Sequence, residues 1–176
     1  LKVYMSATVE TILLYTIAAG FLSIVYGFFT GKNILNQSTG NAKMQDIASA
    51  IQIGAKAYLA RQYKTIGIVG VVVLVIVSIA FSPLVGLGYL IGATLSGIAG
   101  YVGMLVSVEA NVRTAEASRR GLAQGLSVAF KSGAVTGMLV AGLALLAIAV
   151  YYYILLKINI EEREIVNALV APVSYT

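Results

Sequence analysis

The hydrophobic and polar positions divide the chain into long apolar stretches separated by short charged ones. No residue between Lys64 and Glu109 is charged, and the only strong break in this stretch is Ser82-Pro83. Proline lacks a backbone N–H and disfavours helix in the residue before it, so this pair predicts a turn. A bilayer core about 30 Å thick needs roughly 20 helical residues to cross it. Because 65–82 and 84–108 are each about that long, the pattern predicts a membrane-embedded helical hairpin whose helices satisfy their own backbone groups.

Two more uncharged stretches, 11–30 and 132–156, are long enough to span a membrane. The first follows Lys2, which raises the alternative of a cleaved signal peptide. Its length and the bulky Phe28-Phe29, a poor cleavage site, favour a retained span. The sequence therefore predicts an all-α integral membrane fold with four transmembrane helices.

The segment before the hairpin is polar but has a helical period. Residues 31–40 have the composition of a loop, and Asn41 after them is a suitable N-cap. Apolar and amphipathic positions then recur at spacings of three and four: Met44, Ile47, Ile51, Ala55, Tyr58, Leu59 and Gln62. No glycine or proline interrupts 61–65, which favours one long helix over 41–82 whose second half, 65–82, is the span. The alternative is a helix that lies flat on the bilayer surface.

Small residues recur every four positions in the third and fourth spans. Gly92, Ser96 and Gly100 form one such strip, and Gly133, Gly137 and Ala141 form the other. Close backbone approach drives helix association in lipid, so these strips predict packing within the bundle rather than a dedicated dimer face. Tyr151, Tyr152 and Tyr153 near the end of the fourth span are interpreted as an aromatic belt at the membrane–water interface rather than a ligand site.

Composition and charge agree with a membrane protein. Hydrophobic residues make up 59% and charged residues 11%, well above and below the values of soluble domains. The chain has no cysteine, so disulfides and thiolate metal sites are excluded, and no histidine, the commonest general base and metal ligand. The net charge of +5 resides in loops that flank apolar spans, which argues against a nucleic-acid partner.

The distribution of lysine and arginine predicts the orientation in the membrane. With four spans, the connections 31–64 and 109–131 share one side, and they carry Lys32, Lys43, Lys56, Arg61, Lys64, Arg113, Arg119, Arg120 and Lys131. The other side carries Lys2, Lys157 and Arg163. Positive charge accumulates in cytoplasmic loops. Both large connections are therefore predicted to be cytoplasmic, and both ends of the chain are predicted to lie outside.

Candidate chemistry is sparse. No span has an ionisable residue in its middle, so these helices are not expected to conduct ions by themselves. In the polar connection 109–131, Arg113, Glu116, Arg119 and Arg120 have the spacing of helix-face ion pairs. The alternative is that these residues form a phosphate-binding site, although no Gly-rich phosphate loop is present. The carboxylates are scattered, with no Asp-rich cluster to hold Mg²⁺. We therefore predict no catalytic, cofactor-binding or metal-ligating residue in this chain.

Several segments resemble a known family. Met44–Lys64 is similar to the entry of the second helix in membrane-bound, ion-translocating inorganic pyrophosphatases. The same holds for Gly92–Met104, for the run Ala-Asn-Val-Arg-Thr-Ala at 110–115 and for Ser127–Met138. The resemblance extends in order from about residue 9 to 156.

The resemblance implies a function that composition alone leaves open. Members of this family couple pyrophosphate hydrolysis to pumping of H⁺ or Na⁺, use Mg²⁺, and in some cases need K⁺. They are homodimers whose subunits form a two-ring bundle of about sixteen helices, and this chain resembles the N-terminal, outer-ring portion. The short first loop resembles prokaryotic members, which implies a prokaryotic cell membrane.

The chain departs from the family in one respect. The Asp-rich motifs that hold the substrate in the family do not occur here, and Thr176 falls about where the helix leading to the first of them is expected. We therefore expect this chain to be inactive in hydrolysis by itself. A four-span transporter or channel subunit, and a structural membrane assembly partner, are the alternatives.

Overall fold

The computed structural model describes residues 7–158, 165 and 169, and within them the chain is almost entirely helical. The four helices are α1 (Ala7–Leu35), α2 (Ala42–Ala80), α3 (Pro83–Ser118) and α4 (Leu122–Lys157). Each is long and apolar enough to cross a membrane. The predicted all-α fold with four membrane helices is confirmed. The sequence of 157–164 is rich in charged residues and 167–176 is mostly apolar, and both segments lie largely outside the described residues.

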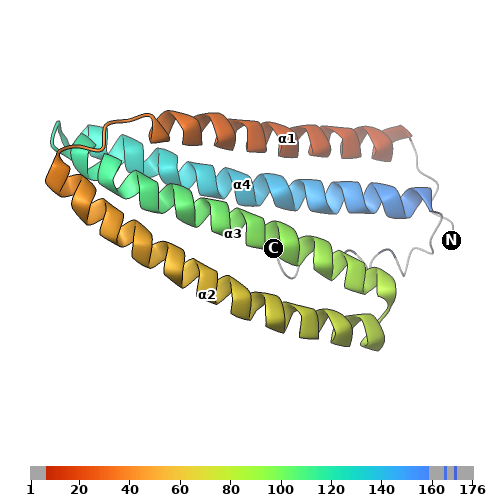
Figure 1. The fold of residues 1–176 in the computed structure, drawn as a ribbon. Coiled ribbons are helices and arrows are strands. Elements are labelled where there is room, and N and C mark those ends of the chain that lie inside the picture. The colour runs from red at the N-terminus through yellow and green to blue at the C-terminus, as the bar shows by residue number, and fades with distance from the viewer. Residues whose placement is uncertain (1–6, 159–164, 166–168, 170–176) are drawn as a thin grey trace.

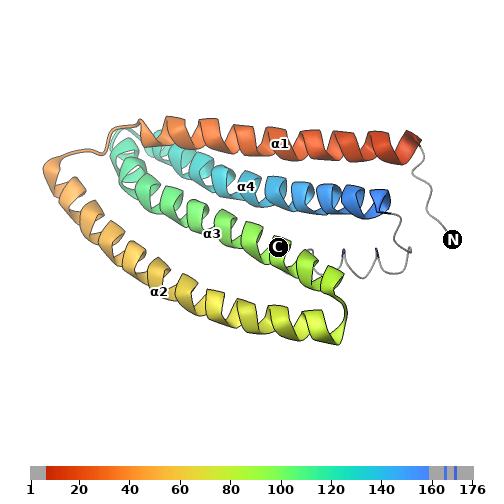
Figure 2. The same ribbon diagram turned by 45° about the vertical axis from the view of Figure 1, so that its right-hand side comes forward.

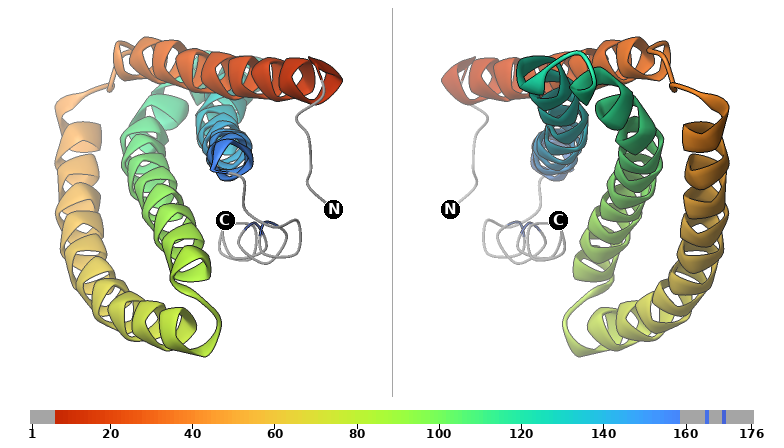
Figure 3. Two further views of the ribbon diagram at one scale, coloured as in Figure 1. Left: turned by 90° about the vertical axis from the view of Figure 1, so that its right-hand side faces the viewer. Right: turned by 90° about the vertical axis from the view of Figure 1, so that its left-hand side faces the viewer.

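The helices form a curved row in the spatial order α2, α3, α4 and α1. Figures 1 and 2 show this order from two directions, and the end-on views of Figure 3 show α2 at one edge of the row, with α3 between it and α4. Helix α1 packs on α4 and touches α3 to a lesser extent. Helix α2 contacts α3, and its one buried residue is Leu59. The edge position leaves most of the α2 surface for lipid or other protein.

The predicted N-cap at Asn41 and the predicted turn at Ser82-Pro83 are both confirmed, and Ser82 in addition caps α3. The Asn41 side chain accepts a hydrogen bond from the Met44 N–H at 3.0 Å, which caps α2. The Ser82 hydroxyl accepts one from the Val85 N–H at 3.3 Å, and Pro83 takes the first helical position, where no N–H is needed. Between these caps α2 continues through Lys64 without a break.

Helix α1 is longer than the sequence indicates. We expected a loop from Gly31, but α1 continues to Leu35. The reason is tertiary: Ile34 is fully buried in a cluster with Ala110, Val128 and Val135. Burial of Ile34 stabilises a last turn whose polar composition alone indicates a loop.

A strip of small residues on α1 makes the closest helix contact, and sequence reasoning missed it. Gly20, Ser23, Gly27 and Gly31 recur at spacings of three and four, and all are buried. A Cβ atom on Gly142 of α4 would lie 2.8 Å from the Gly20 carbonyl oxygen, so the two backbones nearly touch. The signal was the same spacing of small residues that we noted only in the other spans.

The small residues predicted to pack on α4 behave differently. Gly133, Gly137 and Ala141 are exposed, and a Cβ atom on Gly133 or Gly137 would meet no atom within 4 Å. Packing of this strip within the bundle is therefore not found among the described helices. Helix α4 instead uses another face, on which Gly142 meets α1 and Thr136 meets Gly103 of α3.

One of the three tyrosines near the end of α4, Tyr151, differs from the expected belt. Tyr151 is 3% exposed, and its hydroxyl donates a hydrogen bond to the Leu84 carbonyl at 2.6 Å. It therefore connects α4 to the start of α3 inside the bundle. The environment of Tyr153 differs from that of Tyr151. The centre of the Tyr153 ring lies 4.8 Å from the Lys157 ammonium, in a cation–π contact.

Candidate functional site

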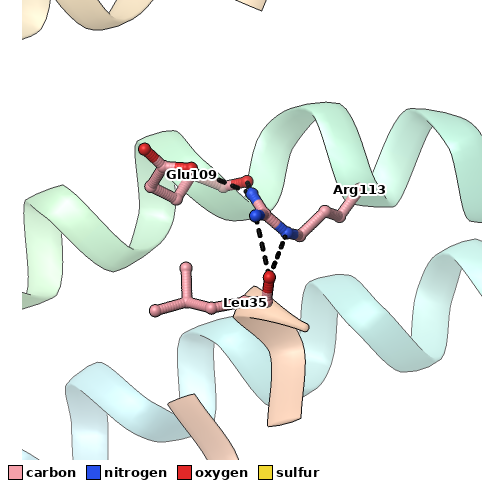
Figure 4. Close-up of polar contacts among 3 residues, drawn as sticks. All are labelled: Leu35, Glu109 and Arg113. Carbon is pink, nitrogen blue, oxygen red and sulfur yellow. Dashed lines mark hydrogen bonds and ion pairs between the residues drawn. The ribbon is translucent and has the colours of Figure 1, made fainter. Parts of the chain in front are cut away.

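The most elaborate polar cluster lies where the ends of α1 and α3 meet. Arg113 of α3 is 8% exposed, and its guanidinium donates two hydrogen bonds to the Leu35 carbonyl, from Nε at 3.2 Å and from Nη2 at 2.9 Å. Nη1 donates to the Glu109 carboxylate at 2.9 Å and to the Glu109 carbonyl (Figure 4). Because the last carbonyls of a helix have no partner within it, Arg113 acts as a cap for α1 supplied by another helix.

A second ion pair lies one turn further along α3. Arg119 donates to the Glu116 carboxylate at 3.0 Å, and the Arg119 side chain is 61% exposed. Glu116 lies against the α1–α2 connection, since a Cβ atom on Gly40 would be 2.8 Å from its Oε2. Gly40 has a φ of +76°, a conformation that glycine adopts without strain. The cluster therefore fixes the end of α1, the turn into α2 and the end of α3 together.

Three more contacts between helices use a hydroxyl and a backbone carbonyl. Tyr63 of α2 donates to the Gly97 carbonyl at 2.7 Å, and Ser23 of α1 donates to the Met138 carbonyl at 2.8 Å. The Tyr151 bond to Leu84 is the third. Such bonds contribute about 0.6 kcal/mol on average between membrane helices, so they serve to fix register more than to add stability.

Two of the arginines with the predicted spacing of ion pairs, for which a phosphate site was the alternative, do form ion pairs. Arg113 and Arg119 form ion pairs, as the helical spacing indicates, but Arg113 pairs with Glu109 rather than with Glu116. The sequence did contain this signal, because Glu109 precedes Arg113 by four residues. Since the Arg113 guanidinium is directed into the helix contact, its geometry favours capping over the alternative of a phosphate site.

Among the described residues, the acidic side chains of the polar cluster are paired with arginines. Within the described residues, no three or more histidine, cysteine, aspartate or glutamate side chains form a group that could hold a metal ion. Mg²⁺ requires oxygen ligands in near-octahedral arrangement, usually including carboxylates. The carboxylate of Glu109 is paired with Arg113 and that of Glu116 with Arg119. The arrangement can therefore join helix ends.

Comparison with known proteins shows which family this helical unit is similar to. The sequence profile described as inorganic H⁺ pyrophosphatase matches residues 21–173. A K⁺-insensitive pyrophosphate-energized proton pump of Methanosarcina mazei is 43% identical over 76% of this chain and 20% of its own length. A K⁺-insensitive pyrophosphate-energized proton pump 2 of Moorella thermoacetica is 38% identical over 77% of this chain and 20% of its own.

A third relative has a different ion in its name. This protein of Clostridium tetani carries the provisional name K⁺-stimulated pyrophosphate-energized sodium pump, and it is 40% identical over 82% of this chain and 22% of its own length. The chain thus spans about a fifth of the length of the curated relatives it matches. Since the profile covers most of the 176 residues, this chain belongs to the inorganic H⁺ pyrophosphatase family.

Proposed function

We propose that this chain is the N-terminal, outer-ring part of a pyrophosphate-energised ion pump that moves H⁺ or Na⁺ across a prokaryotic cell membrane. The observation that carries the proposal is the family match over residues 21–173 in a chain that spans about a fifth of its relatives. In this role α1–α4 form a rigid membrane scaffold in a homodimeric protein. The Arg113 cluster and the glycine contacts between α1 and α4 support a scaffold, because both fix helix positions.

Hydrolysis is proposed to take place in other parts of the protein. Pyrophosphate hydrolysis in this family is expected to use Mg²⁺ and, in some members, K⁺. The described residues lack a group of acidic side chains suited to Mg²⁺, which supports the proposal that the chain is inactive by itself. The absence of ionisable residues from the middle of the four spans likewise supports an ion pathway elsewhere.

The test is to identify the native species that contains this chain. An antibody against Met44–Lys64, applied to the source membrane, is expected to detect a protein about four times larger than 18.4 kDa, because the 136 matched residues make up 20% of the Methanosarcina mazei relative. Depletion with this antibody is expected to remove Mg²⁺-dependent phosphate release from pyrophosphate. A species near 18 kDa, with activity left in the supernatant, would contradict the proposal and favour a four-span transporter subunit or an assembly partner.

We propose that the α1–α2 connection and the α3–α4 turn face the cytoplasm and that the α2–α3 turn lies outside. The excess of lysine and arginine near the first two supports this orientation. The structure offers suitable reporters, because Ser38 and Phe81 are both exposed in their turns.

Cysteine labelling tests this orientation. In a cysteine-free background, Phe81→Cys is expected to react with a membrane-impermeant maleimide in intact cells. Ser38→Cys is expected to react only in inverted vesicles or after permeabilisation. Labelling of Ser38→Cys from outside intact cells would show that the orientation is reversed.

A further inference from the structure

An apolar groove runs along the membrane part of the α2–α3 pair. Two cavities, of about 490 and 390 Å³, share Ile66, Gly67, Ala93 and Thr94 and so form one continuous depression. Two of these shared residues, Gly67 and Ala93, are small, and a Cβ atom on Gly67 would meet nothing within 4 Å. From Tyr63 to Leu74 the groove follows α2 over 12 residues, a rise of about 16 Å. That length is about half of the 30 Å hydrocarbon core, the depth of one lipid leaflet.

The end of the groove toward Lys64 carries residue types that are common at a membrane–water interface. The rings of Tyr63 and Tyr101 pack edge to face there, with centroids 5.4 Å apart. Tyrosine favours the lipid headgroup level. Lys64 follows Tyr63 directly and lies 17 residues, or about 26 Å, along α2 from Phe81 at the opposite turn. This distance is close to the thickness of the hydrocarbon core, which places the Lys64 ammonium near the phosphates.

The charges at this end are of one sign. Lys56, Arg61 and Lys64 are exposed on α2 within nine residues. The nearest carboxylate on α2 is Asp46, 18 residues before Lys64. On α3 it is Glu109, which is paired with Arg113 and lies 12 residues, or about 18 Å, beyond Gly97. Within α2 and α3 as described, this positively charged rim has no neighbouring carboxylate, which makes it complementary to an anionic headgroup.

The surface of α2 around the groove resembles a lipid-facing surface more than a helix contact. Its exposed residues are large and β-branched: Val69, Val71, Val72, Val75, Ile76 and Ile79. Where helices of this chain do meet closely, as at Gly20 and Gly142, the residues are glycines. Small residues are typical of helix contacts in membranes, because lipid tails are as apolar as the side chains themselves.

We propose that the α2–α3 groove is a binding site for an anionic phospholipid. One acyl chain lies along Ile66, Gly67 and Ala93, and the phosphate group lies against Lys64. Bound in this way, the lipid fills the space between the two helices and holds α2, which has one buried residue, against the rest of the unit.

Native mass spectrometry of the native protein that contains this chain tests the proposal. The delipidated protein in detergent is offered phosphatidylglycerol or phosphatidylcholine with identical acyl chains. Phosphatidylglycerol is expected to bind more tightly and to raise the thermal midpoint. Lys64→Gln is expected to weaken phosphatidylglycerol binding about five-fold, the effect of one lysine near a lipid surface. Lys131→Gln on α4, which removes an exposed lysine away from the groove, is the matched control and is expected to bind normally.

A second variant tests the acyl chain. Gly67→Leu introduces a side chain into open space of the groove and is expected to reduce binding of both lipids. Equal binding of the two lipids together with unchanged binding by Lys64→Gln would overturn the proposal. It would also be overturned if Gly67→Leu left lipid binding intact but destabilised the protein, since that result would show another helix in the groove. If Gly67→Leu fails to fold, the exposed Lys64→Gln variant still decides the outcome.

Discussion

Replacing Arg113 by alanine is expected to lower the free energy of unfolding of this helical unit by about 2–3 kcal/mol. The substitution removes two charged hydrogen bonds to the Leu35 carbonyl at the end of α1, and hydrogen bonds to charged groups contribute roughly 1.5–3 kcal/mol. It also leaves the Glu109 carboxylate without its partner. Since Glu109 is 36% exposed, water compensates for part of that loss. The measurement is the thermal midpoint of the native protein in detergent, with protease cleavage in 36–41 as a local readout.

Two further arginine variants show whether the effect comes from the geometry of Arg113. Arg119→Ala removes an exposed ion pair and is expected to cost less than about 1 kcal/mol. Arg113→Lys keeps the charge, but a lysine lacks the planar fork that reaches the carbonyl and the carboxylate together, so an intermediate loss is expected. If Arg113→Ala and Arg119→Ala lowered the thermal midpoint equally, the assignment of Arg113 as a cap for α1 would be wrong.

Replacing Gly142 by leucine is expected to destabilise the contact between α1 and α4 by about 2–3 kcal/mol, the upper range for adding a side chain to a packed site. The new Cβ atom would lie 2.8 Å from the Gly20 carbonyl oxygen and 3.0 Å from the Ser23 Cβ. A backbone oxygen cannot turn aside as a side chain can, so α1 as a whole must move. That movement would also break the bond from the Ser23 hydroxyl to the Met138 carbonyl.

The matched control is Gly133→Leu on the same helix. Its Cβ atom would meet nothing within 4 Å in the described part of the chain, so it tests the general cost of leucine on α4. Disulfide formation between Gly27→Cys and Leu139→Cys reports the separation of α1 and α4 directly, because a Cβ atom on Gly27 would lie at ordinary contact distance, 3.5 Å, from the Leu139 Cγ atom. Efficient cross-linking in the Gly142→Leu background would show that the two helices tolerate the added side chain, against this prediction.

The positions of helix starts and turns could be predicted because they depend on neighbouring residues. Asn41 caps α2 through a contact three residues away, and Ser82-Pro83 ends one helix and begins the next by the same local means. The lengths of the apolar stretches likewise indicated helices long enough to span a membrane, because the thickness of the bilayer sets that length. The end of α1 was misplaced because Ile34 is held by burial against α3 and α4, which no local pattern reveals.

Less of the candidate site could be predicted from the sequence. Ion pairing of Arg113 was expected from its spacing, but its bond to Leu35, 78 residues away, depends on the packing of α1 against α3 and α4. Tyr151 was expected at the membrane surface, since tyrosine prefers that position. In the structure the Leu84 carbonyl provides a partner for its hydroxyl inside the bundle.

The sequence by itself determined that this is a four-helix membrane unit, because the bilayer imposes length and apolarity on each helix separately. Its resemblance to the pyrophosphatase family rests instead on particular motifs, such as the run at 110–115. Only the tertiary structure decided which small residues meet. The strips on α1 and α4 have the same spacing, yet Gly20 and Gly142 are in contact while Gly133 and Gly137 face outward. The spacing shows that a helix has a small-residue face, but the partner of that face is set by how all the helices pack together.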